Sequence, residues 1–319
     1  MAKHILAADI GGTSSRFALF RTAAGQPAEI ETACELQTGA FASLLELLQA
    51  ARAEHHSLSP DSAAAAVLAV PGPVEGGKRA RLANVKWPVD LGPVERRYGG
   101  CPFFLINDFE AQAFGCLTLA VETVRQIKSG RRQTNGMLAV VGAGTGLGHC
   151  ALKSDNRGTP VAFPSEAAHA VFPLSGSPES GFRRFLTATA GTREPTADLV
   201  VSGRGLALLH RYLTGEDLSP QQVARQISPQ SETTDWFARF YARACRHYAL
   251  AVLPLAGLFV SGGVAVKNPF LVDNDTWRAE FVRSETKQQL LEAIRVDLVT
   301  DEWIGLWGAA RYGIDRLLR

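Results

Sequence analysis

The feature that most constrains this chain is a short glycine-rich turn between two apolar runs, and the feature occurs twice. The first turn, residues 9–13 (Asp-Ile-Gly-Gly-Thr), separates an apolar run at residues 5–10 from a second at 15–22. The second turn, residues 142–146 (Gly-Ala-Gly-Thr-Gly), follows about 130 residues later. Apolar runs of this length joined through glycines predict paired strands. Each turn is therefore expected to connect two neighbouring strands of a sheet.

The rest of the chain mixes strand-like and helix-like patterns. Further apolar runs predict strands, and leucine-rich or long amphipathic segments predict helices. The predicted strands are 29–38, 64–70, 102–107, 136–141, 149–153, 257–260 and 295–300, and the predicted helices are 41–55, 110–120, 233–255 and 304–318. Residues 175–232 are rich in polar residues, Pro and Gly and carry no clear assignment. The alternation indicates an α/β protein, with two related lobes.

Composition excludes several classes of partner. The chain has 319 residues, enough for two domains, and its net charge of +2 gives no reason to expect nucleic acid or an anionic membrane as partner. Nineteen uncharged residues, 248–266, reach the length of a membrane span, but Pro254 and several glycines favour a helix end, a turn and a buried strand. Five widely spaced cysteines without a CxxC pair and the lack of a signal peptide indicate a cytoplasmic protein with free thiols.

The glycine turns suit a polyphosphate, because glycines let backbone N–H groups approach a phosphate and a Thr hydroxyl adds a donor. The chain contains no GxxxxGK[ST], and the second turn fails the GxGxxG spacing at Leu147. Each turn taken alone is better explained as an ordinary hairpin turn. Asp9 favours the phosphate interpretation, since a carboxylate beside phosphates requires a cation such as Mg²⁺ between them. A third glycine turn, residues 261–264, also follows a buried strand.

Two polar pairs are candidates for the chemistry. Asn107 and Asp108 follow an apolar strand, and a carboxylate there can accept the proton of a hydroxyl that attacks a phosphate. The alternative is that Asp108 caps the helix that follows. Glu166 and His169, three residues apart, can grip adjacent sugar hydroxyls, or alternatively bind a metal.

Six segments in one order resemble the bacterial glucokinase family. They are residues 9–13, 105–111 (LINDFEA), 141–148 (VGAGTGLG), 163–169 (FPSEAAH), 200–206 (VVSGRGL) and 259–264 (FVSGGV). The resemblance implies the two-lobed actin-like ATPase fold, which is ribonuclease H-like, with a central cleft that closes on sugar and ATP. It implies a small lobe at 1–108, onto which a C-terminal helix at 302–319 packs back, and a large lobe at 109–301.

The resemblance also implies an activity and its residues. The activity is ATP-dependent phosphorylation of glucose at the 6-hydroxyl, with Mg²⁺ and with Asp108 as the catalytic base. The residues implied for the sugar are Asn107, Asp108, Glu166, His169 and Asp198. Those implied for the nucleotide are Ala8, Asp9, Ile10, Gly11, Gly12, Thr13, Gly142, Gly144, Thr145, Gly146, Gly262 and Gly263, with Asp9 also serving the metal. Members of this family are often homodimers.

Three positions depart from the family pattern. Ala167 and Ala168 stand where the family commonly has Gly-Gly, and Asp198 stands where it has Glu. These changes leave open a kinase for another hexose or an amino sugar, and a non-catalytic sugar sensor of the same fold. A DNA-binding regulator would need a helix-turn-helix before the first strand, and the strand begins near residue 4. An actin-like filament or chaperone ATPase would lack the sugar-binding set.

Overall fold

The computed structural model describes residues 3–23, 27–82, 85–119 and 121–317, which form two compact units. The described parts of 1–119, 155–162 and 303–319 make up unit 1, and those of 120–154 and 163–302 make up unit 2. Helix α3 (Asp108–Gly115) belongs to unit 1, whereas the expected lobe boundary at residue 108 would put it in the second lobe. Its placement follows from packing against α12 (Ile304–Leu317), where the rings of Phe114 and Tyr312 meet edge to face at 5.1 Å.

Unit 1 is built on a sheet of five strands in the order β3-β2-β1-β4-β7. The strands are β1 (Lys3–Ile10), β2 (Ser14–Thr22), β3 (Glu29–Gln37), β4 (Ala65–Val70) and β7 (Phe103–Asn107). The first three form an antiparallel meander, and β4 and β7 then add in parallel beside β1. A short pair, β5 (Arg79–Ala80) and β6 (Val89–Asp90), forms a separate ribbon.

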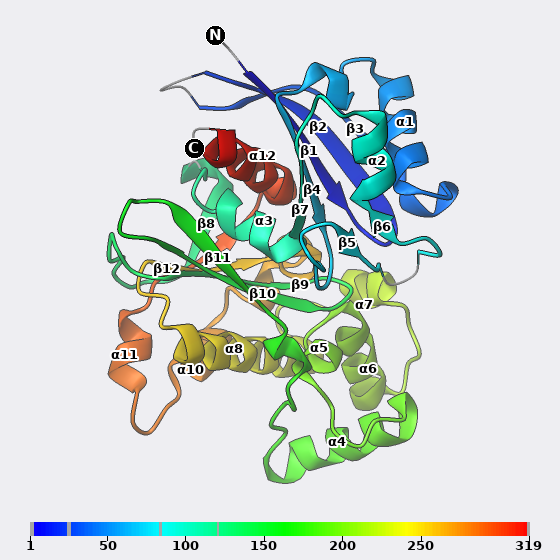
Figure 1. Cartoon of the computed structure of the whole chain (residues 1–319). Helices are drawn as coiled ribbons and strands as arrows, with labels where there is room; N and C mark the ends of the chain where they lie inside the picture. Colours follow the sequence, from blue (N-terminus) through cyan, green and yellow to red (C-terminus); the bar gives the residue numbers. More distant parts are fainter. Residues whose placement is uncertain (1–2, 24–26, 83–84, 120, 318–319) are drawn as a thin grey trace. The chain divides into compact units, whose positions relative to one another are not determined.

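Helices cover both faces of this sheet (Figure 1). Because side chains alternate along a strand, Leu6 and Ala8 face a core shared with α1 (Leu44–Glu54) and α2 (Leu91–Arg97). The opposite face packs against α12, where Phe20 meets Trp307 at 5.0 Å. Helix α1 begins three residues later than predicted, because the Ser43 side chain caps it by accepting from the Glu46 amide.

Unit 2 repeats the strand arrangement of unit 1. Its sheet has the order β11-β10-β9-β12-β13-β8. The strands are β8 (Val124–Lys128), β9 (Leu138–Ala143), β10 (Leu147–Ser154), β12 (Gly257–Ser261), β13 (Val296–Val299) and the edge strand β11 (Pro160–Ser165), of which residues 160–162 fall in unit 1. As in unit 1, an antiparallel hairpin (β9, β10) is followed by two parallel strands, β12 and β13; β8 adds an antiparallel edge.

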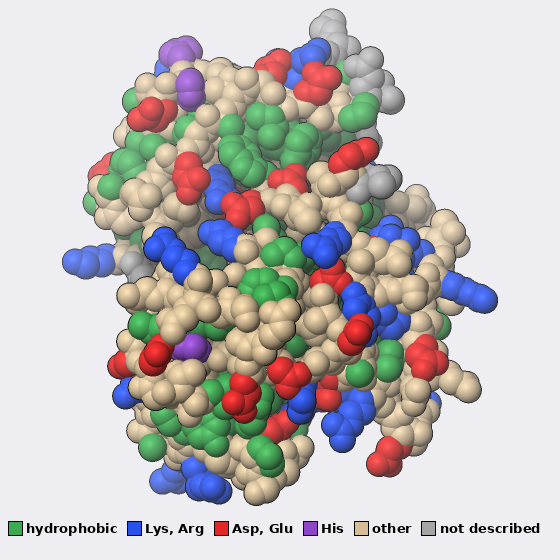
Figure 2. Space-filling model, turned by 180° about the vertical axis from the view of Figure 1, so that it is seen from behind, with side chains coloured by type: hydrophobic (Ala, Val, Ile, Leu, Met, Phe, Trp, Pro, Cys, Tyr) green, Lys and Arg blue, Asp and Glu red, His purple; other side chains and the backbone are tan. Residues whose placement is uncertain are grey.

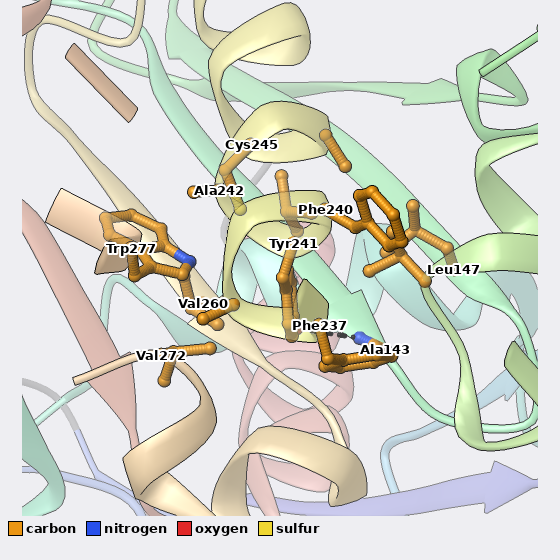
Figure 3. Close-up of a cluster of buried hydrophobic side chains, with 14 of the residues drawn as sticks. Ala143, Leu147, Phe237, Phe240, Tyr241, Ala242, Cys245, Val260, Val272 and Trp277 are labelled. Carbon is orange, nitrogen blue, oxygen red and sulfur yellow. Dashed lines mark hydrogen bonds between the residues drawn. The ribbon is translucent and has the colours of Figure 1, made fainter. Parts of the chain in front are cut away.

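The long helix α8 (Glu232–Val252) lies at the centre of the helical layer of unit 2. Its buried aromatic residues Phe237, Phe240 and Tyr241 share one hydrophobic core with the strands and with Trp277 of α10 (Asp275–Val282) (Figure 3). The remaining helices are α4 (Gly176–Ala190), α5 (Ala197–Val200), α6 (Gly203–Thr214), α7 (Pro220–Gln226), α9 (Gly263–Lys267), α10 (Asp275–Val282) and α11 (Gln288–Ala293). Among the described helices, α8 included, none is long and apolar enough to cross a bilayer.

A buried charge cluster holds the polar middle of the chain in place. Arg243 of α8 is 6% exposed and makes a bidentate pair with Glu179 of α4, at 2.7 and 2.8 Å. Its Nε also donates to Glu280 of α10 at 3.1 Å. A buried guanidinium is tolerated only when its donors are satisfied. These bonds therefore tie α4, in a region that the sequence left unassigned, to the central helix.

The surface carries both signs of charge. Acidic and basic side chains are intermixed over the face seen in Figure 2, in line with the net charge of +2. No single sign dominates that face.

We expect the stability of the fold to depend on pH through His149 of β10. Burial lowers the pKa of this histidine from 6.5 to about 4. As the pH falls from about 6.5 to about 4, the unfolded chain binds a proton that the folded chain excludes. The free energy of unfolding should therefore fall by about 3 kcal/mol over this window. Urea unfolding of the wild type and His149→Leu at pH 7 and pH 4 measures the difference.

The exposed His56 provides the control. His56→Leu should keep the pH dependence of the wild type, whereas His149→Leu should lose less stability on acidification. Equal losses in the wild type and His149→Leu would contradict the assignment.

Candidate active site

The first glycine turn connects β1 and β2, as predicted. It closes through a bond from the Gly11 amide to the Ser14 carbonyl, 2.9 Å long. Buried Thr38, which follows β3, holds the turn from outside: its amide donates to the Thr13 carbonyl at 2.9 Å and its hydroxyl to the Gly11 carbonyl at 2.8 Å. The Gly11 and Thr13 carbonyls are thus bonded within the protein, while the Thr13 side chain is exposed to solvent.

Asp9 lies at the end of β1 with its carboxyl largely removed from water. Burial raises the pKa of this carboxyl; Arg16, opposite Asp9 on β2, opposes the shift and Glu35 adds to it. The first turn of α12 closes on the same group, since a Cβ at Gly305 would lie 3.0 Å from Asp9 Oδ2. A carboxylate whose charged form is disfavoured by burial gains from a nearby cation. Asp9 therefore fits the metal role that the resemblance implies.

Asn107 and Asp108 lie at the same edge of the sheet as the first turn. The parallel register pairs Asp9 with Ala69 and Val70 with Asn107, so β1 and β7 end together with β4 between them. Two strand spacings separate their ends by about 10 Å. The capping alternative is correct only in part: Asp108 is not the N-cap, but its Oδ1 accepts from the Phe109 amide at 2.9 Å. Asn107 is the N-cap, accepting from two amides of α3, and Asp108 is the first helical residue.

Asn107 is heavily engaged. Besides its capping bonds at 2.9 and 3.2 Å, its Nδ2 donates to the Gly72 carbonyl at 3.0 Å. One amide hydrogen is left beyond these bonds. A direct contact of Asn107 with a ligand would therefore be made through that hydrogen.

The second glycine turn connects β9 and β10 and is equally constrained. The Gly144 amide donates to the Gly146 carbonyl at 2.7 Å, and the Gly144 carbonyl accepts from Gly203, the first residue of α6, at 2.9 Å. A Cβ placed on Gly144 would meet no atom within 4 Å, and the Thr145 side chain is exposed. An open space beside a fixed backbone turn is what a phosphate needs.

A single hydroxyl joins the second turn to the third. Tyr241 is fully buried; its hydroxyl accepts from the Ala143 amide at 3.0 Å and donates to the Ser261 carbonyl at 3.2 Å. Figure 3 shows the bond between Tyr241 and Ala143. Gly262 has a φ of +87°, and a Cβ there would lie 2.5 Å from the Ala143 carbonyl oxygen. The ends of β9 and β12, and the glycines that follow them, thus form one rigid pair.

Glu166 and His169 come together as predicted. Their side chains lie 3.5 Å apart, both well exposed, on the turn that holds the short 3₁₀ helix at Ala167–His169. The two alanines between them differ in setting: Ala167 is exposed, but Ala168 is 1% exposed and its methyl group packs in the core of unit 2. The Ala168 departure therefore leaves this surface unchanged.

Asp198 lies on α5 beside this segment, since the Ala197 amide donates to the Ala170 carbonyl at 3.2 Å. Its carboxylate oxygen accepts from the Leu147 amide, at the end of the second glycine turn, at 2.8 Å. Unit 2 thus brings together Glu166, His169, Asp198 and the second and third turns. Unit 1 brings together Asp9, the first turn, Asn107 and Asp108.

Three supporting residues escaped the sequence analysis: Thr38, Tyr241 and Gly305. Each acts on a turn from a distant point of the chain. The predicted strand at 29–38 ends at Thr38 and the predicted helix at 233–255 contains Tyr241, but neither residue stands in a recognisable motif. For these two residues the available signal is that buried hydroxyls need partners; no sequence signal marks Gly305.

Nearly the whole chain, including the candidate site residues, is similar to known proteins. A family model described as Glucokinase matches residues 6–315. A glucokinase of Chelativorans sp. (strain BNC1) is 31% identical over 97% of this chain and 90% of its own length. The crystal structure of a glucokinase from an Antarctic psychrotroph has a TM-score of 0.82, with 26% identity, covering 97% of this chain and 98% of that one. A glucokinase from Balamuthia mandrillaris, solved in complex with glucose, shares the fold at 19% identity, with a TM-score of 0.81 over 98% of this chain and 93% of that one.

We expect Tyr241→Phe to destabilise unit 2 by about 1–3 kcal/mol, because the change leaves the buried Ala143 amide without the Tyr241 hydroxyl. Urea denaturation at pH 7 measures this. Tyr248→Phe is the matched control, since Tyr248 is also buried on α8 and its hydroxyl has no hydrogen-bond partner in the described part of the chain.

The control should change stability by less than about 0.5 kcal/mol. Similar losses in both variants would show that the Tyr241 hydroxyl does not join the two turns in the way described.

Proposed function

The chain belongs to the glucokinase family, and we propose that it transfers the γ-phosphoryl group of ATP to the 6-hydroxyl of glucose. The observation that carries this proposal is that the glycine turns, Asp108, Glu166 and His169 all stand in the order of the family on the strand ends and turns of its fold. With this activity the protein is an α/β enzyme of the sugar kinase class.

Asp108 is the proposed base. It begins α3 directly after β7, at the sheet edge where Asp9 also lies. The Asp108 carboxylate accepts the proton of the sugar hydroxyl while the hydroxyl oxygen bonds to the γ-phosphorus and ADP leaves. Because the transition state of phosphoryl transfer is loose, holding this hydroxyl in line matters more than a strongly basic carboxylate.

The glycine turns are the proposed nucleotide site. The first and second turns offer exposed Thr13 and Thr145 hydroxyls and backbone amides to the phosphates, and Gly262 and Gly263 line the adenosine side. Asp9 holds Mg²⁺, directly or through water. When bound, Mg²⁺ neutralises charge on the phosphates.

Glu166 and His169 are the proposed sugar ligands. Both side chains are exposed and lie 3.5 Å apart, so they are accessible to a polar ligand. A carboxylate accepts from sugar hydroxyls, and an imidazole donates or accepts according to its tautomer. Asn107 and Asp108 of unit 1 are the other residues that the family resemblance implies for the sugar.

A hexose panel tests the activity. ADP release with Mg·ATP should be fastest, in kcat/KM, on glucose, compared with mannose, fructose, glucosamine and N-acetylglucosamine. A preference for another sugar would replace glucose as the substrate. Sugar binding without turnover on any member would contradict the kinase proposal and favour a sensor.

We expect Asp108→Ala to lower kcat by about 10²–10⁴-fold while glucose affinity, measured by calorimetry, changes only a few-fold. Glu110→Gln is the matched control, because Glu110 lies in the same first turn of α3. Turnover of Asp108→Ala near the wild-type rate would exclude Asp108 as the base.

A further inference from the structure

The carboxylate of Asp198 is bonded to the second glycine turn. Its Oδ1 accepts from the backbone amide of Leu147 at 2.8 Å. Leu147 is the first residue of β10 and directly follows Gly146. A carboxylate that accepts a backbone N–H forms one of the stronger classes of hydrogen bond. This bond therefore fixes the point at which the turn becomes a strand.

The same carboxylate fills the space beside Gly146. A Cβ at this glycine would lie 2.3 Å from Asp198 Oδ1, 3.3 Å from Cγ and 3.7 Å from Oδ2. No real Cβ contact is as short as the first of these. Asp198 thus lies directly against the turn, and a side chain at position 146 would have to displace its carboxylate.

The position of Asp198 is itself fixed by neighbours other than the turn. Thr196 caps α5 by accepting from the Leu199 amide at 3.3 Å. Buried Ala197 donates to the Ala170 carbonyl at 3.2 Å, and Ala170 directly follows His169. Helix α5 therefore connects the Glu166–His169 segment to the glycine turn, and Asp198 is the side chain that makes the final contact.

We propose that Asp198 is a positioning residue of the phosphate-binding turn and is not a ligand of the sugar. This inference rests on the proposed function and reassigns one residue within it. The sugar is then recognised without a carboxylate at position 198, through Glu166 and His169. Loss of the Asp198 carboxylate should weaken nucleotide binding and leave sugar binding unchanged.

Steady-state kinetics of three variants test this. Asp198→Ala should raise KM for ATP by about 10-fold or more, with KM for glucose within about 2-fold of wild type. Asp198→Asn keeps an oxygen acceptor of the same reach, so its KM for ATP should rise much less. A sugar ligand would behave in the opposite way: both variants would raise KM for glucose and leave KM for ATP unchanged. That result would overturn the proposal.

Asp198→Glu separates the two roles most sharply, because it restores the family residue. The extra methylene moves the carboxylate away from the position in which it contacts Gly146 and accepts from the Leu147 amide, so we expect KM for ATP to rise and KM for glucose to stay constant. A lower KM for glucose with an unchanged KM for ATP would overturn the proposal.

Asp155→Ala is the matched control. Asp155 follows the opposite end of β10, and its Oδ1 also accepts from turn amides, those of Arg157 and Thr159, at 2.8 and 2.9 Å. Removing it perturbs a turn of the same strand without touching the glycine turn. It should leave both KM values within about 2-fold of wild type. A rise in KM for ATP equal to that of Asp198→Ala would overturn the proposal.

A measurement without substrates keeps this inference separate from the proposed function. Hydrogen exchange at the Leu147 amide should speed up by about 10-fold or more in Asp198→Ala and only slightly in Asp198→Asn. Unchanged exchange in Asp198→Ala would overturn the positioning role. If the wild type phosphorylates no sugar but the exchange result holds, the proposed function fails and the bond to the turn stands.

Discussion

Parallel pairing at the centre of each sheet is the constraint on which the rest of the structure depends. In unit 1, β1, β4 and β7 run the same way and end at one edge; in unit 2, β9, β12 and β13 do the same. Residues far apart in the sequence, such as Asp9 and Asn107, reach the same sheet edge because of this pairing. Parallel strands deliver their carboxyl ends, and the polar residues that follow them, to a common edge.

A turn that binds phosphate faces a second requirement, because its amides must be open to a ligand while its backbone stays fixed. The structure meets this requirement with side chains from elsewhere. The Thr38 hydroxyl donates to a carbonyl of the first turn, and the buried Tyr241 hydroxyl bonds to the ends of both β9 and β12. In both cases a buried hydroxyl satisfies backbone groups that face the interior. The outward side of each turn is thereby left to solvent or to a ligand.

Most of this fold could be predicted from the sequence where local patterns are strong. The predicted strands at 5–10, 15–22 and 257–260 match β1, β2 and β12 to within about two residues. The missed elements have weaker patterns: β8 mixes polar and apolar residues, β11 contains two prolines, and α4 combines two buried apolar residues, Phe182 and Leu186, with the Glu179 pair to Arg243. That pair joins residues 64 apart in sequence, so no local pattern could reveal it.

The candidate site shows the same limit from another side. The order of the motifs identified the family. It could not show whether the departures from the family pattern at positions 168 and 198 affect the site, because the effect of a substitution depends on where its side chain points. The Ala168 methyl group joins the hydrophobic core, where it adds contact and leaves the sugar-facing surface as it was. The Asp198 carboxylate reaches the backbone of the glycine turn, where one methylene decides which group it can contact. Two changes of equal size in the sequence thus act on different parts of the molecule, one on packing and the other on the position of a ligand-binding turn.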